Sequence, residues 1–270
     1  MEKLYIFDLD GTLYEGTDHF DYYAERLATS VAEEKRLEYW NDYKKMKNGN
    51  HTVQIGKGYD VANDATLTID AMTLEVVDAH DWDGNKLPAI ISLYKNKEIQ
   101  FDFEKIIAIG DGWWLPFVCA KHYGVKNCYP HYLETKDYMS SEKFNLDKIS
   151  GLKEGLLKLK QKNKVVLITN SDKDDVERLM ENLDLTNIFD EIISSAKKPS
   201  LTTEHFKKLQ HNNKISYKNM ISIGDNFMNE IAPALLLGIK AVYIAEHKAP
   251  ITHRDLTHIH KIGPWIKQLT

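Results

Sequence analysis

The chain has 270 residues, of which 43% are hydrophobic, and its formal net charge at pH 7 is -5. This length and apolar content suit one large or two smaller globular domains with a substantial core, and they exclude a disordered chain. The mildly acidic charge, with lysines spread along the chain, lacks the electrostatic footprint of a protein that binds nucleic acid or a membrane surface.

The sequence shows no sign of export, membrane insertion or disulfide bonding. Its first residues, MEKLYIFDLDG, lack the apolar stretch of a signal peptide, and no apolar run reaches the length of a membrane span. Cys119 and Cys128 give no disulfide framework and are expected to be reduced, partly buried thiols. We therefore expect a cytoplasmic protein with no nucleic-acid or membrane partner.

The first predicted element is a short buried strand, LYIF at residues 4–7, followed at once by two carboxylates and a glycine. Asp8 and Asp10 are two residues apart, so on an extended chain they face the same way, and Gly11 permits a sharp turn. Two like charges held close repel each other, which favours a cation or a reaction that needs them. The plain alternative is a strand end followed by polar turn residues.

A long segment of different texture follows the first strand and is predicted to form an inserted domain, residues 15–148. Its predicted elements are a helix at 20–46, a strand or hairpin at 66–78, a strand at 105–110, a helix ending near 123, and an irregular polar segment at 129–145. Four aromatic residues near helical spacing are interpreted as domain core rather than as a stacking surface for a substrate: Tyr22, Tyr23, Trp40 and Tyr43.

Strands and helices alternate in the rest of the chain. The predicted strands cover 164–170, 191–195, 219–224 and 240–245, and the predicted helices cover 152–159, 171–183, 202–210 and 230–237, with Ser171 as a helix cap. This order predicts a parallel, doubly wound sheet with helices on both faces. The fold class is therefore α/β, with a Rossmann-like core at 1–14 and 149–270 and a mainly helical cap domain inserted at 15–148.

Polar side chains follow each predicted core strand, at the edge where such sheets bind ligands. After Asp8 and Asp10 they are, in chain order, Thr169, Asn170, Lys198, Asp225, Asn229 and Glu230. Carboxylate oxygens suit Mg²⁺, and a hydroxyl, a lysine and a helix amino terminus suit a phosphate group. Because these residues gather at one edge, a site is a better interpretation than isolated turn residues.

Each of these residues also has a plain structural interpretation. Thr169 alone would be a strand-end threonine, Lys198 a solvated charge like its neighbour Lys197, Asp225 an acid at a helix start, and Asn229 a helix cap. Three histidines resemble a metal cluster but have no acidic companions, so surface histidines are the better interpretation: His253, His258 and His260.

At this point the sequence resembles the haloacid dehalogenase superfamily, whose four motifs occur here in order. DLDGT at residues 8–12 is similar to the family's DxDGT, and the threonine of LITNS, Thr169, is similar to its second motif. Lys198 before a proline resembles the third motif, and GDNFMNE at 224–230 resembles the fourth, GDSxxND. The resemblance covers the predicted core well and the inserted domain poorly.

Two positions of the fourth motif depart from the family. Glu230 stands where the family has aspartate, and Asn226 stands where it has serine. The longer Glu230 would then contact water bound to the metal rather than the metal. Asp10 indicates the phosphatase branch of the superfamily, because the dehalogenase branch lacks an acid at this position.

The resemblance implies a role for each motif residue. Asp8 would attack phosphorus in line and form an aspartyl-phosphate, and Asp10 would protonate the leaving oxygen and then deprotonate the attacking water. The implied residues around the phosphoryl group are Gly11, Thr12, Thr169, Asn170 and Lys198. Mg²⁺ would be held by Asp8, the backbone carbonyl of Asp10 and Asp225, with Asn229 and Glu230 in a surrounding shell.

The expected function is therefore Mg²⁺-dependent hydrolysis of a small phosphorylated metabolite, with the inserted domain as a lid. One alternative is a phosphomutase or phosphotransferase with the same first step. The other is a catalytically idle binding protein on the same scaffold, which would be expected to lose Asp8 or Asp10.

An internal echo complicates the fourth motif. Residues 106–129 align without a gap with residues 220–243, and eight positions are identical, among them Asp111 and Asp225. Motif order assigns the fourth motif to Asp225, because Asp111 precedes Thr169 in the chain. Convergence of two strand–turn–helix segments is the favoured explanation of the echo.

Overall fold

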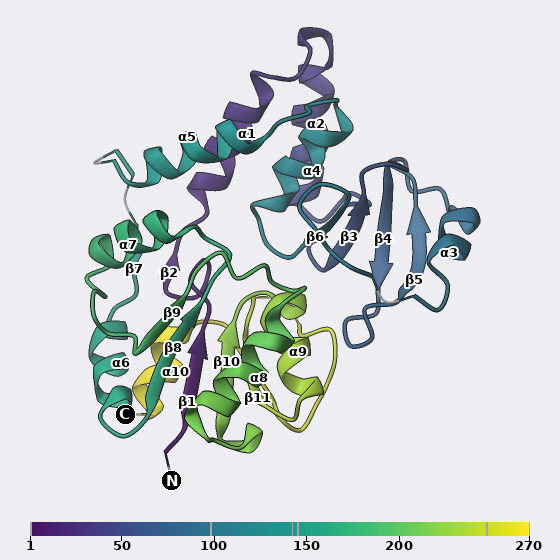
Figure 1. The fold of residues 1–270 in the computed structure, drawn as a ribbon. Coiled ribbons are helices and arrows are strands. Elements are labelled where there is room, and N and C mark those ends of the chain that lie inside the picture. The colour runs from purple at the N-terminus through teal and green to yellow at the C-terminus, as the bar shows by residue number, and fades with distance from the viewer. Residues whose placement is uncertain (1, 98, 142, 145, 247, 270) are drawn as a thin grey trace. The chain divides into compact units, whose positions relative to one another are not determined.

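The computed structural model of the chain describes residues 2–97, 99–141, 143–144, 146–246 and 248–269. It contains two compact units (Figure 1): one comprises Met1–Gly16 with Asn145–Thr270, and the other comprises Thr17–Phe144. The chain thus leaves the first unit early, builds the second unit and returns. Among the described residues, no helix has the length and apolar content needed to span a membrane.

The first unit is built on a six-stranded sheet in the order β12–β11–β10–β1–β8–β9, and every neighbouring pair is parallel. The strands are β1 (Leu4–Phe7), β8 (Lys164–Ile168), β9 (Glu191–Ile193), β10 (Met220–Gly224), β11 (Lys240–Ile244) and β12 (Leu256–Ile259). All four residues of β1 are buried, because this strand lies between β10 and β8 with both faces covered.

Helices cover both faces of this sheet, as the alternation predicted. They are α6 (Leu152–Lys160), α7 (Lys173–Asn182), α8 (Thr202–Asn213), α9 (Ala232–Leu236) and α10 (Ile262–Leu269), with short turns η2 (Tyr217–Asn219) and η3 (Phe227–Ile231). Figure 1 shows α8 and α9 in front of the sheet and α10 behind it. α6 packs closely on α10, because a Cβ atom on Gly155 would lie 2.9 Å from Cγ1 of Ile266.

The sequence did not predict β12 or α10. β12 is an edge strand whose residues are only partly buried, so its text is polar and lacks the apolar run of a central parallel strand. Two-residue strands β2 (Tyr14–Glu15) and β7 (Asp147–Lys148) were also missed. They pair antiparallel, with Tyr14 opposite Lys148, and lie where the chain leaves and re-enters this unit.

The second unit is mainly helical and also contains a four-stranded antiparallel sheet in the order β5–β4–β3–β6. Its helices are α1 (Asp18–Ala28), α2 (Arg36–Lys47), α3 (Pro88–Tyr94), α4 (Trp114–His122) and α5 (Tyr129–Met139), with the short turn η1 (Glu33–Lys35). Its strands are β3 (Lys57–Asp60), β4 (Ala65–Ile69), β5 (Val76–His80) and β6 (Ile106–Ile109).

Two expectations about this unit are wrong. The single helix at 20–46 is two helices, and the first ends where Thr29 Oγ1 donates to the carbonyl of Arg26, a local bond that competes with helix continuation. The segment 129–145 is not irregular, because α5 occupies most of it. Its start carries a signal that was missed: Pro130 lies in the first turn, where its lack of an N–H does no harm.

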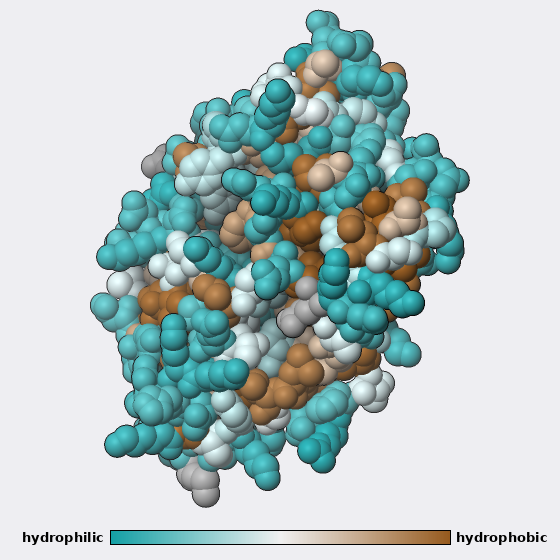
Figure 2. Space-filling view, turned by 45° about the vertical axis from the view of Figure 1, so that its right-hand side comes forward, coloured by the Kyte–Doolittle hydropathy of each residue, from teal (hydrophilic) through white to brown (hydrophobic). Residues whose placement is uncertain are grey.

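The hairpin expected at 66–78 is confirmed by the pairing of β4 with β5. The aromatic stripe is only partly core, because Tyr23 and Tyr43 are buried whereas Trp40 is 37% exposed. Cys119 and Cys128 are buried free thiols. The face in Figure 2 is mostly hydrophilic, and apolar side chains form small patches on it.

Candidate active site

Asp8 follows β1 directly and is almost fully buried. Its backbone N–H donates to the carbonyl of Ile223 in β10 at 2.9 Å, which continues the parallel ladder up to the carboxylate. Oδ1 of Asp8 accepts a hydrogen bond from Nζ of Lys198 at 2.6 Å. Burial raises the pKa of Asp8, Lys198 opposes this effect without cancelling it, and the charge of Asp10 adds to the rise.

Lys198 lies between two carboxyl groups. Its ammonium donates to Asp8 at 2.6 Å and to Oε2 of Glu230 at 3.1 Å, and its side chain is only 3% exposed. Burial alone would lower the pKa of Lys198, but the two carboxylates more than offset it, so the pKa is raised and the ammonium stays charged. Lys197 beside it is exposed, as expected.

Glu230 reaches Lys198 from the turn η3. Oε1 accepts a hydrogen bond from the backbone N–H of Asn226 at 2.8 Å, and Oε2 accepts one from Lys198. Burial raises the pKa of Glu230 to about 8, although Lys198 acts in the opposite direction. Both of its oxygens are therefore engaged by protein donors, and its extra methylene spans the distance to the lysine.

Asp10 is held by two hydroxyl groups. The hydroxyl of Tyr14 donates to Oδ1 at 2.5 Å, and Oγ of Ser171 donates to Oδ2 at 2.9 Å. Neither residue was predicted to lie at the site. Ser171 was expected to cap the next helix, but the N-cap position of α7 is Asp172. The missed signal is its place two residues after Thr169, in a loop that must turn toward the first motif.

The loop after β8 is joined to the loop that carries Lys198. Oγ1 of Thr169 accepts from the backbone N–H of Ser171 at 3.0 Å, and the threonine is 1% exposed. The side chain of Asn170 donates to the carbonyl of Lys198 at 3.0 Å and accepts from its N–H at 2.7 Å. These two hydrogen bonds between the side-chain amide of Asn170 and the backbone of Lys198 fix the two loops against each other.

Gly11 brings the loop after β1 against Asp225, which follows β10. Its φ of +71° is a left-handed conformation, and a Cβ atom here would lie 2.2 Å from Oδ2 of Asp225. Thr12 beside it is fully buried, and its hydroxyl has no hydrogen-bond partner among the residues that the structure describes. Only glycine allows this close approach of the two loops.

Asn226 and Asn229 fix the turn after Asp225. Oδ1 of Asn226 accepts from the N–H of Asn229 at 3.1 Å and so caps the π-helical turn η3. Asn229, for which a helix cap was the plain alternative, contributes its N–H to this cap, and its carbonyl accepts from Oγ1 of Thr202 at 2.6 Å.

Three carboxyl groups of this edge could hold a metal ion. One oxygen each from Asp8, Asp225 and Glu230 lies within 4.8 Å of the others, and within the described part of the chain this is the one such group. Hard oxygen donors at this spacing fit Mg²⁺. Asp8 and Asp225 fit best, since Glu230 already accepts two hydrogen bonds.

Asp111, the counterpart of Asp225 in the echo, lies elsewhere. It follows β6 in the antiparallel sheet of the second unit, and its Oδ1 accepts from the N–H of Trp113 at 2.9 Å. The two segments therefore share a strand–turn–helix sequence pattern, but their strands belong to different sheets. Of the three C-terminal histidines, His258 and His260 both contact the carbonyl of Ala245, at 2.9 and 3.2 Å.

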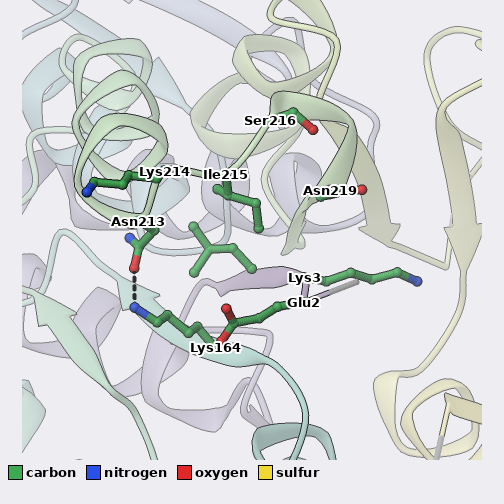
Figure 3. A pocket seen from close by; sticks show the side chains of 9 residues that line it. Glu2, Lys3, Lys164, Asn213, Lys214, Ile215, Ser216 and Asn219 are labelled. Atoms are coloured by element: carbon green, nitrogen blue, oxygen red, sulfur yellow. Dashed lines mark hydrogen bonds between the residues drawn. The ribbon is translucent and has the colours of Figure 1, made fainter.

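A cleft of about 360 Å³ lies at the opposite edge of the core sheet, beside the first residues of β1 and β8 (Figure 3). Figure 3 shows Lys164 bonded to Asn213, while Lys3 and Lys214 point away from each other. None of the predicted site residues lines this cleft. The predicted site residues, such as Asp8, Lys198 and Asp225, lie at the carboxyl ends of the strands instead.

Comparison with known proteins agrees with this arrangement. Residues 118–244 match the family model of the haloacid dehalogenase-like hydrolases, a span that includes the loops of Thr169, Lys198 and Asp225. This segment of 127 residues, just under half of the chain, is similar to the haloacid dehalogenase-like hydrolases. A search of curated protein sequences found no match.

Solved structures of haloacid dehalogenase-like proteins share the fold over nearly the whole chain. A family hydrolase from Xanthomonas campestris is 14% identical with a TM-score of 0.50, covering 99% of this chain and 94% of that one. A putative family hydrolase from Bacillus subtilis, solved bound to magnesium, is 14% identical with a TM-score of 0.53, covering 99% and 98%. A putative β-phosphoglucomutase from Thermotoga maritima is 15% identical with a TM-score of 0.51, covering 100% and 98%. Identities this low show the fold alone.

Proposed function

We propose that this haloacid dehalogenase-like protein hydrolyses a small phosphomonoester in a Mg²⁺-dependent reaction, through an aspartyl-phosphate on Asp8. The observation that carries the proposal is the buried contact of 2.6 Å between Asp8 and the Lys198 ammonium. A carboxylate in this position has a nearby positive charge that can receive phosphoryl oxygens as they approach. A structural ion pair would gain nothing from two further acids, Asp225 and Glu230, at the same place.

In the first step Asp8 forms a bond to phosphorus, and the bond from phosphorus to the leaving oxygen breaks. Asp10 gives a proton to that oxygen and afterwards takes one from the water that attacks the aspartyl-phosphate. The phosphoryl oxygens are received by Lys198 and by the loop of Thr169 and Asn170, which the hydrogen bonds described above hold together. Gly11 and Thr12 complete the turn under the phosphoryl group.

We assign the metal ligands to Asp8, Asp225 and the backbone carbonyl of Asp10, with Asn229 and Glu230 around them. A bound Mg²⁺ would neutralise the clustered carboxylates and stabilise charge on the phosphoryl oxygens. Glu230 keeps Lys198 in place through its 3.1 Å contact. The substrate is a small phosphorylated metabolite, and the unit of residues 17–144 acts as the lid that selects it.

The experiment is a phosphate-release assay on an aryl phosphate, with and without Mg²⁺, for the wild type and Asp8→Asn. Wild-type protein should release free phosphate only with Mg²⁺, and Asp8→Asn should release none, because an amide is not a nucleophile for this step. Near-normal turnover by Asp8→Asn would overturn the mechanism. Transfer of phosphate to a second alcohol in place of release would replace hydrolysis by phosphotransfer, and no turnover at all would leave a binding protein.

A further inference from the structure

The carboxylate of Asp10 has an unusually complete set of neighbours for a residue at the edge of a site. Tyr14 donates to one oxygen at 2.5 Å and Ser171 donates to the other at 2.9 Å. Both donors are buried, since Tyr14 is 1% and Ser171 is 4% exposed. A carboxylate gripped on both sides keeps one orientation rather than the several rotamers open to it in water.

The two oxygens of Asp10 face different groups. Ser171 belongs to the loop of Thr169, whose Oγ1 accepts from the N–H of Ser171 at 3.0 Å, and this loop is proposed to receive the phosphoryl group. Oδ2 of Asp10 therefore points to the reacting side. Oδ1 accepts its hydrogen bond from Tyr14.

Tyr14 is itself fixed by the backbone around it. It forms β2, which pairs with β7 so that Tyr14 lies opposite Lys148 and Glu15 lies opposite Asp147. The pairing sets the direction of the strand, and the ring is buried with its hydroxyl donating to Asp10. All of these residues belong to the same compact unit.

We infer that Tyr14 is a positioning residue for Asp10, and that its effect appears with phosphate esters whose leaving group needs a proton. The inference rests on the proposed function, because it takes Asp10 as the acid of the first step. In that step the electron pair of the broken phosphorus–oxygen bond stays on the leaving oxygen. The proton on Oδ2 moves to that oxygen, so a neutral alcohol departs and Asp10 becomes a carboxylate.

Tyr14 donates to Oδ1 before and after this transfer, and its hydrogen bond strengthens as Asp10 gains negative charge. An interaction that grows stronger toward the transition state accelerates the step, whereas one of constant strength does not. The Ser171 hydroxyl, which can donate or accept, turns to accept when Oδ2 carries the proton.

The test compares kcat/KM for two esters, 4-nitrophenyl phosphate and glycerol 2-phosphate, in wild type and Tyr14→Phe with saturating Mg²⁺. 4-Nitrophenolate leaves without a proton, so its kcat/KM should change less than about 2-fold, while that of the alkyl ester should fall about 10-fold, the worth of one strong hydrogen bond. A general loss of structure would lower both values equally.

Tyr5→Phe is the matched control. Tyr5 lies in β1, its ring is buried, and its hydroxyl bonds to no group in the described part of the chain, so both values should stay at wild-type level. In an Asp10→Asn background, adding Tyr14→Phe should change neither value, because the tyrosine acts through Asp10 alone.

Equal losses for the two esters in Tyr14→Phe, or a further loss in the Asp10→Asn background, would overturn the positioning role while leaving the phosphatase intact. If the wild type releases phosphate from neither ester, the proposed function fails, and this inference fails with it.

Discussion

Lys198 lies among groups that a lysine rarely meets in solution, with carboxyl oxygens of Asp8 and Glu230 2.6 and 3.1 Å from its ammonium. One positive charge faces two buried acids and the nearby Asp225. Without a cation, protonation of one acid reduces the repulsion among these carboxylates. Burial raises the pKa of Glu230 to about 8, and the charge of Asp8 adds to the rise. A divalent cation between Asp8 and Asp225 would also reduce this repulsion.

Asp225→Asn tests this account because it removes one charge while almost preserving shape. In metal-free buffer the free energy of unfolding should stay the same or rise slightly, since the variant removes repulsion between the clustered acids. Phosphate release should fall at low Mg²⁺ and recover in part at high Mg²⁺. Urea unfolding with EDTA and a Mg²⁺ titration of activity provide the two measurements.

Asp111→Asn is the control for that experiment, because Asp111 occupies the same position in the echo segment but lies in another sheet. Its Mg²⁺ dependence should equal that of the wild type. A shifted Mg²⁺ requirement in Asp111→Asn, or unfolding of Asp225→Asn in metal-free buffer, would mean that the metal site is assigned to the wrong loop.

At the scale of elements, Asp42 shows how a polar side chain can connect several of them. It lies in α2, and its Oδ2 accepts from Nε1 of Trp82 at 2.9 Å and from the hydroxyl of Tyr123 at 2.7 Å. Lys45 donates to Oδ1 at 2.8 Å. Burial acts to raise the pKa of Asp42, but the three donors outweigh this effect, and the pKa is lowered to about 2.

A pKa below the unfolded value means that Asp42 stabilises the fold when ionised. This contribution is fully present above about pH 4 and is lost as the pH falls toward about 2. Asp42→Asn should therefore lower the free energy of unfolding by about 2 kcal/mol at pH 7 and by much less near pH 2.5. Urea unfolding followed by tryptophan fluorescence measures both values, with Trp82 as a local probe.

Asp83→Asn is the comparison, because Asp83 is exposed and close to Trp82 in the chain. It should change the free energy of unfolding by less than about 0.5 kcal/mol at either pH. A loss in Asp42→Asn that is equally large at pH 7 and pH 2.5 would show that its ionisation does not matter.

At the scale of the whole molecule, the chain builds one unit, interrupts it and completes it later. The interruption lies between two short strands in register, with Glu15 opposite Asp147. Antiparallel strands in this register can be joined directly by a two-residue turn such as Asn-Gly. The first unit should therefore fold without the second.

We predict that replacing residues 16–146 by Asn-Gly gives a protein that unfolds cooperatively and keeps Mg²⁺-dependent release of phosphate from 4-nitrophenyl phosphate. It should lose preference among larger phosphate esters, because the proposed lid is gone. Thermal unfolding by circular dichroism and an ester panel provide the measurements. A shortened chain without a cooperative transition would show that the first unit needs the second in order to fold.

The sequence by itself was sufficient for features that depend on neighbouring residues. The apolar runs of β1, β8 and β10, the alternation with helices and the polar residues after each strand are local patterns, so they predicted the parallel sheet and the common edge of Asp8, Thr169, Lys198 and Asp225. Less regular text misled the same reasoning. The polar residues of α5 favour an irregular segment, and β12 has no signal in the sequence because an edge strand does not need an apolar run.

Tertiary structure decided which side chains meet across long distances in the chain. Tyr14 and Ser171 converge on Asp10, although 157 residues separate them in sequence, and Glu230 rather than solvent receives Lys198. No local pattern encodes such a meeting, because it depends on how strands far apart in the chain are ordered in the sheet. The same ordering places the look-alike Asp111 in another sheet. Sequence determined which chemical groups are present at the strand ends, and packing determined which of them touch.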